Sequence, residues 1–327
     1  MKTHRKDRRD GVKPMKTADE TPPIVCVANR FASLFERAVQ EVKREGVEAS
    51  SATLLRYWDT YYGPAPSLAE ENANWHILDV IPKKIINPLA NKRQLPALLT
   101  EAGIHDVSPA TYLSVEEALN HQGEAVSIWF FKSIYGTGGK NMYCVANEYL
   151  DGSELPSNFV IQAGVRNLSL IDGKKFTARI YVLIWHGRVF LYRNGFLMVH
   201  AELFDEASTD YAVQIDHFGY EKPDSRVKMK QLMQYEQYDA VMGRYLDLIK
   251  RIKPVLADTI KASSQSSYIL LGIDTLIQTD GNVKLIEINT FPNFVHTSEI
   301  IDQVNVPFFK AAIRTMLGES IPTLIEV

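Results

Sequence analysis

Hydrophobic and polar positions alternate with a period of two over much of the second half of the chain. The segment KFTARIYVLIWHGRVFLYRNGFLMV, residues 175–199, holds two such runs around His186 and Gly187. Alternation of this kind predicts strands, and the short His-Gly connection predicts a hairpin. A second pair of apolar runs, YILLGIDTLIQ and VKLIEIN, flanks Asp280 and Gly281. Asp-Gly is a favoured two-residue hairpin turn, so this stretch also predicts two antiparallel strands.

The first half of the chain mixes helical and extended patterns. Short apolar strands are expected at 22–31 and 75–81, with a helix of period 3.6 between them that Gly46 ends. Another helix is expected at 91–104. The segments AVSIWFFK and NMYCVA flank a glycine-rich loop, SIYGTGGK, which predicts a strand–loop–strand hairpin. Further expected elements are a strand at FVIQAGV, a helix within 226–262 and a last helix ending near Leu317.

This order of elements predicts an α+β protein with antiparallel sheets in its second half. We expect a disordered basic tail at 1–22, an N-terminal α/β subdomain at 23–90, a central subdomain at 91–160 and a C-terminal subdomain at 161–327. Composition is that of an ordinary globular protein, with 46% hydrophobic and 23% charged residues among 327.

Charge and cysteine content narrow the class of protein. The net charge of −3 gives no reason to expect a nucleic acid as partner. The two cysteines form no CxxC pair, so we expect no disulfide framework and a reducing, cytoplasmic location. No apolar run approaches the roughly 18 residues of a membrane-spanning helix, so a membrane partner is not expected either.

Polar residues interrupt the late apolar strand pair at matching places. If Asp280 and Gly281 form the turn, Asp274 lies opposite Glu287, and Asn289 shares the face of Glu287. Two facing carboxylates repel each other and are costly to bury in an apolar strand pair. A divalent cation relieves both effects, and few carboxylates with open positions suit Mg²⁺ shared with phosphate oxygens. The alternative is a polar row that faces solvent.

Basic residues and glycines offer a place for that phosphate. Lys132 ends a buried strand, and the loop after it can wrap an anion with backbone N–H groups. A plain flexible hairpin loop is the alternative. In the next hairpin a two-residue turn at 186–187 would set Arg179 opposite Asn194, next to Arg193. Two cations so close favour an anion, and a transferring phosphoryl group is a candidate; the alternative is an exposed sheet face.

The same segments resemble a known family. FVIQAGV, LIDGKKFTARIYVLI…VFLYRNGFL and YILLGIDTLI…VKLIEINTFPN are similar to the motifs of the tubulin–tyrosine ligase-like family, within the ATP-grasp superfamily. The resemblance runs from about Ile86 to Phe309. It implies an ATP-grasp fold of three subdomains, with ATP gripped between two antiparallel sheets.

The resemblance also implies roles for individual residues. Mg²⁺ would be held by Asp274, Glu287 and Asn289. Catalysis would involve Arg179, Arg193 and Lys175, with the two arginines facing the γ-phosphate and a substrate carboxylate. ATP would be bound by Lys92, Lys132, Gly136, Gly138, Gly139, Thr177 and an adenine hinge of Gln162, Ala163, Gly164 and Val165. Thr177 stands where the family usually has Asp, and Ala163 where a lysine is common, so the resemblance does not identify the substrate.

The resemblance implies an ATP-dependent carboxylate–amine ligase. A substrate carboxylate would form an acyl-phosphate, and an amine, such as that of an amino acid, would displace phosphate to leave an amide. The expected partners are therefore a small-molecule or peptide carboxylate and an amino-acid amine. One alternative is a non-catalytic ATP-binding scaffold or regulatory module. A metal-dependent hydrolase that uses Asp274 and Glu287 is another. His217 and His296 are candidate bases, but an ordinary loop or packing role is the favoured interpretation of each.

Overall fold

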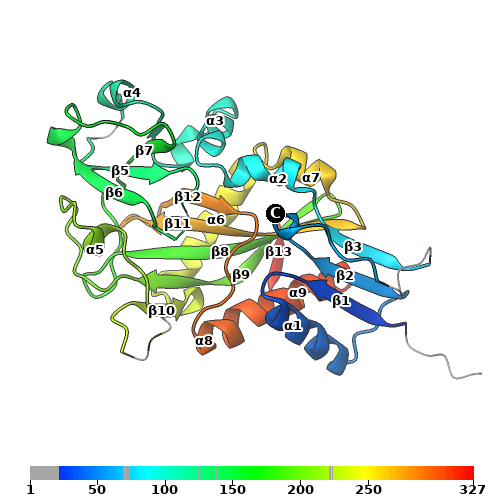
Figure 1. The fold of residues 1–327 in the computed structure, drawn as a ribbon. Coiled ribbons are helices and arrows are strands. Elements are labelled where there is room, and N and C mark those ends of the chain that lie inside the picture. Colours follow the sequence, from blue (N-terminus) through cyan, green and yellow to red (C-terminus); the bar gives the residue numbers. More distant parts are fainter. Residues whose placement is uncertain (1–21, 69–73, 124, 137, 221, 223) are drawn as a thin grey trace, which may run out of the picture.

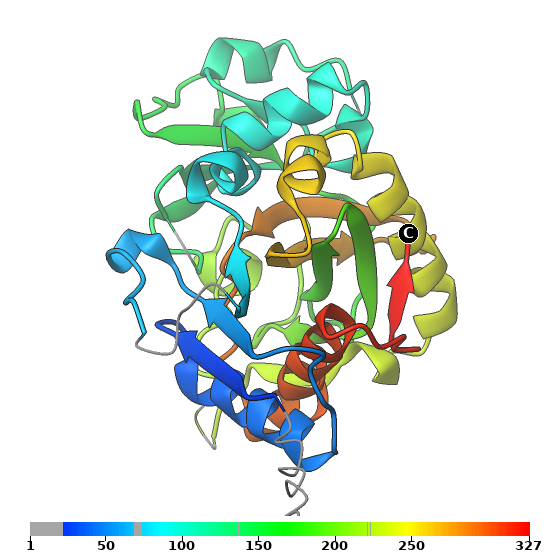
Figure 2. The same ribbon diagram turned by 90° about the vertical axis from the view of Figure 1, so that its right-hand side faces the viewer.

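The fold was analysed in a computed structural model that describes residues 22–68, 74–123, 125–136, 138–220, 222 and 224–327. The expected disordered tail falls on residues 1–21, outside the described residues. Within the described residues the strands form two sheets. Figures 1 and 2 show the smaller sheet and the N-terminal strands at opposite ends of the molecule. The expected α+β class is confirmed.

The larger sheet joins the two ends of the sequence. Its strand order in the described residues is β1-β2-β3-β11-β8-β9-β10, with β12 added beside β11 and β13 beside β9. β1–β3 are mutually parallel, and β3 pairs with β11 in parallel, whereas β8, β9, β11 and β12 form antiparallel pairs. The strands are β1 (Ile24–Ala28), β2 (Thr53–Tyr57), β3 (His76–Val80), β8 (Phe176–Trp185), β9 (Arg188–Val199), β10 (Lys228–Gln231), β11 (Ser267–Ile277), β12 (Val283–Asn289) and β13 (Leu324–Glu326).

The smaller sheet carries the glycine-rich loop. Its order is β4-β7-β5-β6, all antiparallel. The strands are β4 (Thr111–Tyr112), β5 (Ile128–Ser133), β6 (Met142–Ala146) and β7 (Phe159–Ala163). The loop connects β5 to β6, which confirms the predicted strand–loop–strand hairpin. Because β7 belongs to this sheet, the expected subdomain boundary after residue 160 falls inside a strand.

Helices cover both faces of the larger sheet. The apolar residues of α1 (Ala32–Arg44) and α9 (Val306–Met316) pack on one face. On the opposite face lie α2 (Lys83–Ala90), α3 (Gln94–Glu101) and α6 (Tyr238–Ile252). The short helices are α4 (Val115–Leu119), α5 (Tyr211–Gln214), α7 (Ala257–Ala262) and α8 (Ser298–Ile300). No helix among the described residues is both long enough and apolar enough to cross a membrane.

One sequence prediction of secondary structure is only partly correct. The segment 226–262, expected to be helical, begins with strand β10 and becomes helical at α6 and α7. Lys228 pairs with Val199, so this stretch extends the sheet beyond β9. A four-residue strand is too short for its period to stand out beside a long helical pattern.

Candidate active site

The strand pair β11–β12 brings the predicted carboxylates together. Asp274 lies opposite Glu287, and Gly272 lies opposite Asn289, as expected from the sequence. The predicted two-residue turn is wrong, because Gln278 and Asn282 close a three-residue turn in which Gly281 has a left-handed φ of 78°. A register shift after Asp274 leaves Ile286 without a partner and restores the pairing.

Asn289 and the two carboxylates form one hydrogen-bonded group. The Asn289 side-chain amide donates to Asp274 Oδ2 and to Glu287 Oε1, both at 3.0 Å. Arg179 reaches the same group from β8, where it pairs with Asp274 across the sheet. Its Nε and Nη2 donate to the two oxygens of Asp274 at 2.6 Å each. Arg179 therefore neutralises one of the facing carboxylates.

Burial and mutual repulsion set the charge states of this pair. Burial raises the pKa of the Asp274 carboxyl, and the neighbouring Glu287 adds to the rise against the opposing effect of Arg179. For Glu287, burial acts upward, but Lys92 and the hydrogen bonds from its neighbours hold its pKa below the usual value. The pair thus contains one firmly ionised carboxylate and one that resists ionisation.

Lys92 links this group to the glycine-rich loop of the other sheet. It lies between α2 and α3, and its Nζ is 4.0 Å from Glu287 Oε2. The same Nζ donates to the carbonyl of Gly136 at 2.6 Å. Lys92 therefore spans the space between the two sheets, where the resemblance predicts that ATP binds.

Lys132 faces the same space from β5. Its Nζ donates to the side-chain oxygen of Gln162 on the adjacent strand β7 and lies 5.6 Å from the centre of the Phe130 ring. Burial lowers the pKa of Lys132 to about 8, while Glu287 acts in the opposite direction. A bound anion would therefore stabilise the charged form of Lys132, which burial disfavours.

Lys175 is buried beside Lys132, with 5% of its surface exposed. Its Nζ donates to the backbone carbonyl of Gln214 at 2.8 Å and lies 5.0 Å from the Phe130 ring centre. Burial lowers the pKa of Lys175 to about 7, and the charge of Lys132 contributes to the drop. Phe130 and Gln214 were not predicted from the sequence. The alternation of Phe130 with Lys132 on one strand could have identified the first, whereas Gln214 ends the short helix α5, far away in the sequence.

The glycine-rich loop is folded back under a segment of the C-terminal half. Gly138 and Gly139 have left-handed φ values of 60° and 73°, which only glycine adopts readily. A Cβ on Gly139 would lie 2.9 Å from Ile215, and the Tyr211 hydroxyl donates to the Gly139 carbonyl at 3.3 Å. The loop therefore packs against the segment 211–218.

The predicted adenine hinge, residues 162–165, begins in the last two residues of β7 and continues beyond the strand. The N–H groups of Ala163 and Gly164 donate to backbone carbonyls of Ala110 and Ile128 at 2.9 Å each, so they are already used within the protein. Gly164 and Val165 line a small space of about 20 Å³ that also touches Phe130 and Lys175. This space is too narrow for a base in the described conformation.

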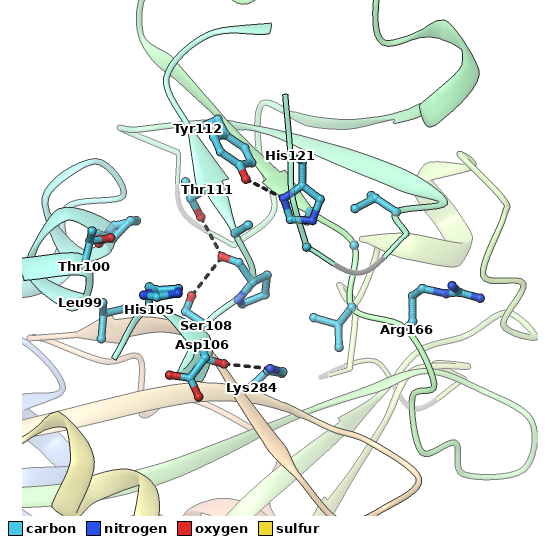
Figure 3. A pocket seen from close by; sticks show the side chains of 18 of the residues that line it. Leu99, Thr100, His105, Asp106, Ser108, Thr111, Tyr112, His121, Arg166 and Lys284 are labelled. Carbon is cyan, nitrogen blue, oxygen red and sulfur yellow. Dashed lines mark hydrogen bonds between the residues drawn. The ribbon is translucent and has the colours of Figure 1, made fainter. Parts of the chain in front are cut away.

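A larger cavity of about 490 Å³ lies on the other side of the hinge. Figure 3 shows its wall, with His105 and Ser108 near one end and Arg166 near the other. Within it Lys284 donates to the carbonyl of Asp106 at 2.8 Å. The residues of the carboxylate group do not line this cavity, so its size alone does not make it the reaction site.

The predicted site residue Arg193 lies apart from the group. Arg193 is exposed and donates to the carbonyl of Pro322 at 3.0 Å. The expected pairing of Arg179 with Asn194 is wrong, because the β8–β9 register shifts after Ile180 and Arg179 pairs with Phe196. The His186-Gly187 turn itself is confirmed by the pairing of Trp185 with Arg188. Thr177 is half-buried on β8, two residues before Arg179.

The side chains at the β11–β12 pair fit a magnesium ion. Two carboxylates and an amide oxygen are hard oxygen donors, and a cation would offset their mutual repulsion. No group of three or more His, Cys, Asp and Glu side chains in the described residues could hold a metal. A site with only two carboxylates suits Mg²⁺ that is completed by phosphate oxygens and water.

Comparison with known proteins relates this chain to one family. The family model "Tubulin-tyrosine ligase family" matches residues 71–323. A probable tubulin polyglutamylase TTLL9 of Mus musculus is 30% identical over 167 residues, which cover 45% of this chain and 36% of the mouse protein. A probable tubulin polyglutamylase of Caenorhabditis elegans is 25% identical over 222 residues, or 59% of this chain and 52% of that protein.

A third relative is a probable tubulin–tyrosine ligase of Schizosaccharomyces pombe, 20% identical over 172 residues, which cover 49% of this chain and 42% of the yeast protein. The chain thus spans about half, or less, of the length of the curated relatives it matches. The family model, in contrast, covers well over half of this chain and includes the glycine-rich loop, Arg179 and the β11–β12 pair. The chain belongs to the tubulin-tyrosine ligase family.

Proposed function

We propose that the protein is an ATP-dependent ligase that joins a carboxylate to an amine. The observation that carries the proposal is the convergence of Asp274, Glu287 and Asn289 with Arg179 and Lys92 between the two sheets. Two carboxylates facing several cations suit a reaction in which phosphate charge must be both bound and neutralised. The names of the relatives refer to tubulin, so we propose a protein or peptide chain of that kind as the acceptor.

The proposed reaction has two steps. A carboxylate oxygen of one substrate attacks the γ-phosphorus of ATP, and the bond to the bridging oxygen breaks to release ADP. The amine nitrogen of the second substrate then attacks the acyl carbon of the resulting acyl-phosphate. The bond from that carbon to the phosphate oxygen breaks, phosphate leaves, and the nitrogen loses a proton to give the amide.

The chain's own residues would supply binding and charge. Lys132 and Lys175 would bind phosphate oxygens, and Lys92 would hold the glycine-rich loop near them. Asp274, Glu287 and Asn289 would hold Mg²⁺, which neutralises phosphate charge when bound. Arg179, which pairs with Asp274 in the described structure, would offset the repulsion between the substrate carboxylate and the phosphates.

Mass spectrometry tests this proposal. The full chain is incubated with ATP, Mg²⁺, pooled amino acids and either tubulin or acidic peptides. We expect a product heavier by one amino acid minus water, with ADP released only when both substrates are present. Glu287→Gln should slow product formation at least about 100-fold, because a charged group at the reacting phosphates is lost.

The matched control is Glu148→Gln, an equal change at an exposed residue outside the cluster. It should leave the rate unchanged. Full activity of Glu287→Gln would refute the role of the carboxylates. Nucleotide binding without turnover on any acceptor would instead favour the scaffold alternative, in which the family fold binds ATP but joins nothing.

A further inference from the structure

The N-terminal strands place a second group of charged residues beside the candidate active site. β1, β2 and β3 are parallel and in register, so their carboxyl ends meet at one edge. Asn29 and Arg30 follow β1, Asp59 follows β2 and Lys83 follows β3. The carboxyl ends of parallel strands are where open α/β sheets bind their ligands.

Asp59 is the fixed centre of this group. Only 4% of its surface is exposed. Its backbone N–H donates to Asn29 Oδ1, and the Asn29 amide donates back to the Asp59 carbonyl, both at 2.8 Å. The N–H of Tyr61 donates to Asp59 Oδ1 at 2.9 Å. The carboxylate is therefore held in one orientation by the loop itself.

Two cations share this single carboxylate. Arg30 Nη1 lies 3.5 Å from Asp59 Oδ2, and Lys83 Nζ lies 3.1 Å from Oδ1. Aromatic rings hold both: the guanidinium of Arg30 lies 5.0 Å from the ring centre of Phe31, and Lys83 Nζ lies 4.7 Å from that of Tyr61. The group therefore carries one positive charge in excess, and both cations stay partly exposed, at 28% and 31%.

A buried hydroxyl next to these residues has no partner. Tyr57, the last residue of β2, is fully buried, and its hydroxyl makes no hydrogen bond with the described residues. Burial raises the pKa of this hydroxyl, with smaller effects from Arg30 and Asp59, so the hydroxyl lies near these two residues. Buried hydroxyls are nearly always hydrogen-bonded, so a further polar atom is expected here.

This charged group is connected to the carboxylates by two residues of chain. Asn289 contacts Asp274 and Glu287, and Phe291 places its ring 6.0 Å from the Arg30 guanidinium and 5.6 Å from the Tyr57 ring. Two residues of extended chain span about 7 Å, and the Phe291 ring lies between that chain and Arg30. A substrate with one end at the carboxylates would therefore reach Arg30 with a polar group several bonds further along.

We propose that Arg30 and Lys83 bind a substrate carboxylate other than the one that reacts. The site would fix a substrate with a second acidic group, either on the acceptor chain or on the incoming amino acid. Asp59 would orient the two cations without cancelling their charge. The inference rests on the proposed ligase function, since it assumes that the reacting group lies near Arg179.

Binding of two small probes tests the site directly. Calorimetry with the full chain measures the affinity for N-acetyl-triglutamate amide, which has only side-chain carboxylates, and for free glutamate, which has an α-carboxylate. Arg30→Gln and Lys83→Met should each weaken the binding of one of these probes about 10-fold or more, because each substitution removes a charged hydrogen bond. If the affinity for the capped peptide depends on Arg30 and Lys83, the site binds the acceptor. If the affinity for free glutamate depends on them, the site binds the incoming amino acid.

The neighbouring Lys84 provides the matched control. It is exposed on the same first turn of α2, so Lys84→Met removes the same charge outside the group. It should change either affinity less than twofold. Equal affinities for wild type, Arg30→Gln and Lys83→Met, or an equal loss in Lys84→Met, would overturn the proposal.

Magnesium-nucleotide binding by each variant checks that the protein remains folded. The two proposals can also fail separately. If probe binding depends on Arg30 and Lys83 but no ligase product forms, the site is supported and the proposed reaction is refuted. Ligase activity with Michaelis constants insensitive to both residues would do the opposite.

Discussion

Replacing Gly272 by alanine tests how tightly the carboxylate group is packed. Gly272 pairs with Asn289, and a Cβ built on it would lie 2.6 Å from Pro292 Cβ and 3.3 Å from Arg179 Cδ. Its φ is not in the left-handed region, so alanine fits the backbone and the effect comes from contact alone.

The magnitude follows from that contact. Ordinary carbon–carbon contacts begin near 3.4 Å, so about 0.8 Å must be gained. Pro292 cannot turn away, because its ring is fixed to the backbone three residues after Asn289. Overpacking of this kind costs about 1–3 kcal/mol, while replacing glycine in a strand returns about 0.5–1 kcal/mol. We expect Gly272→Ala to lower the free energy of unfolding by about 1–2 kcal/mol.

Urea unfolding and magnesium-nucleotide titration measure the two consequences. The displacement should pass along β12 to Asn289 and weaken nucleotide binding as well as stability. Gly243→Ala, within α6 and with nothing near its Cβ, is the control and should stabilise the protein by about 0.5–1 kcal/mol. If Gly272→Ala unfolded at the same urea concentration as wild type and bound nucleotide equally, Pro292 would not be fixed against this strand and the argument would fail.

Three further predictions address the same site. Arg179→Met leaves the Asp274 carboxylate unpaired and should cost about 3 kcal/mol in urea unfolding at neutral pH, with part restored by Mg²⁺; no change would show that the ion pair is dispensable. Nucleotide binding should take up about 1.4 protons at pH 8 and about 0.1 at pH 6, since Lys175 and Lys132, with pKa values of about 7 and about 8, are partly neutral at the higher pH and become charged beside phosphate. Calorimetry in buffers of different ionisation enthalpy measures this, and proton release at pH 8 would contradict it. Gly139→Ala should destabilise the protein more than Gly46→Ala, because both glycines have a left-handed φ but only a Cβ on Gly139 would collide with Ile215. Only Gly139→Ala should also weaken nucleotide binding; equal nucleotide affinities would refute the role of the loop.

The strand pairs show what the sequence could and could not predict. The pairing of Asp274 with Glu287 was predicted from a turn that is wrong by one residue, and the unpaired Ile286 compensates for the difference. Ile286 is an apolar residue between Leu285 and Glu287, and nothing in the local sequence marks it as the unpaired position. The convergence of Asp274, Glu287 and Asn289 was therefore predicted correctly although the turn was not.

The β8–β9 hairpin gave the opposite result. Its turn was predicted correctly, but the register shift after Ile180 moved Arg193 away from Arg179. A signal was present: Gly195 lies opposite Ile180, and a Cβ there would collide with the carbonyl oxygen of Arg179. Glycine inside a strand often marks such an irregularity. Contacts between distant segments, such as Ile215 on Gly139, have no counterpart in local pattern.

The parallel pairing of β3 with β11 joins the N-terminal strands β1–β3 to the half of the chain that carries the candidate site. Tyr268 of β11 accepts a hydrogen bond from the N–H of Ile81 at 2.9 Å, and its hydroxyl donates to the carbonyl of Arg56 at 3.3 Å. A version of the protein shortened to begin after residue 90 would leave the edge of β11 at Ser267 and Tyr268 without its partner strand, although β8 and β12 would still flank Asp274. Unpaired strand edges favour aggregation, so such a fragment would be less soluble than the full chain.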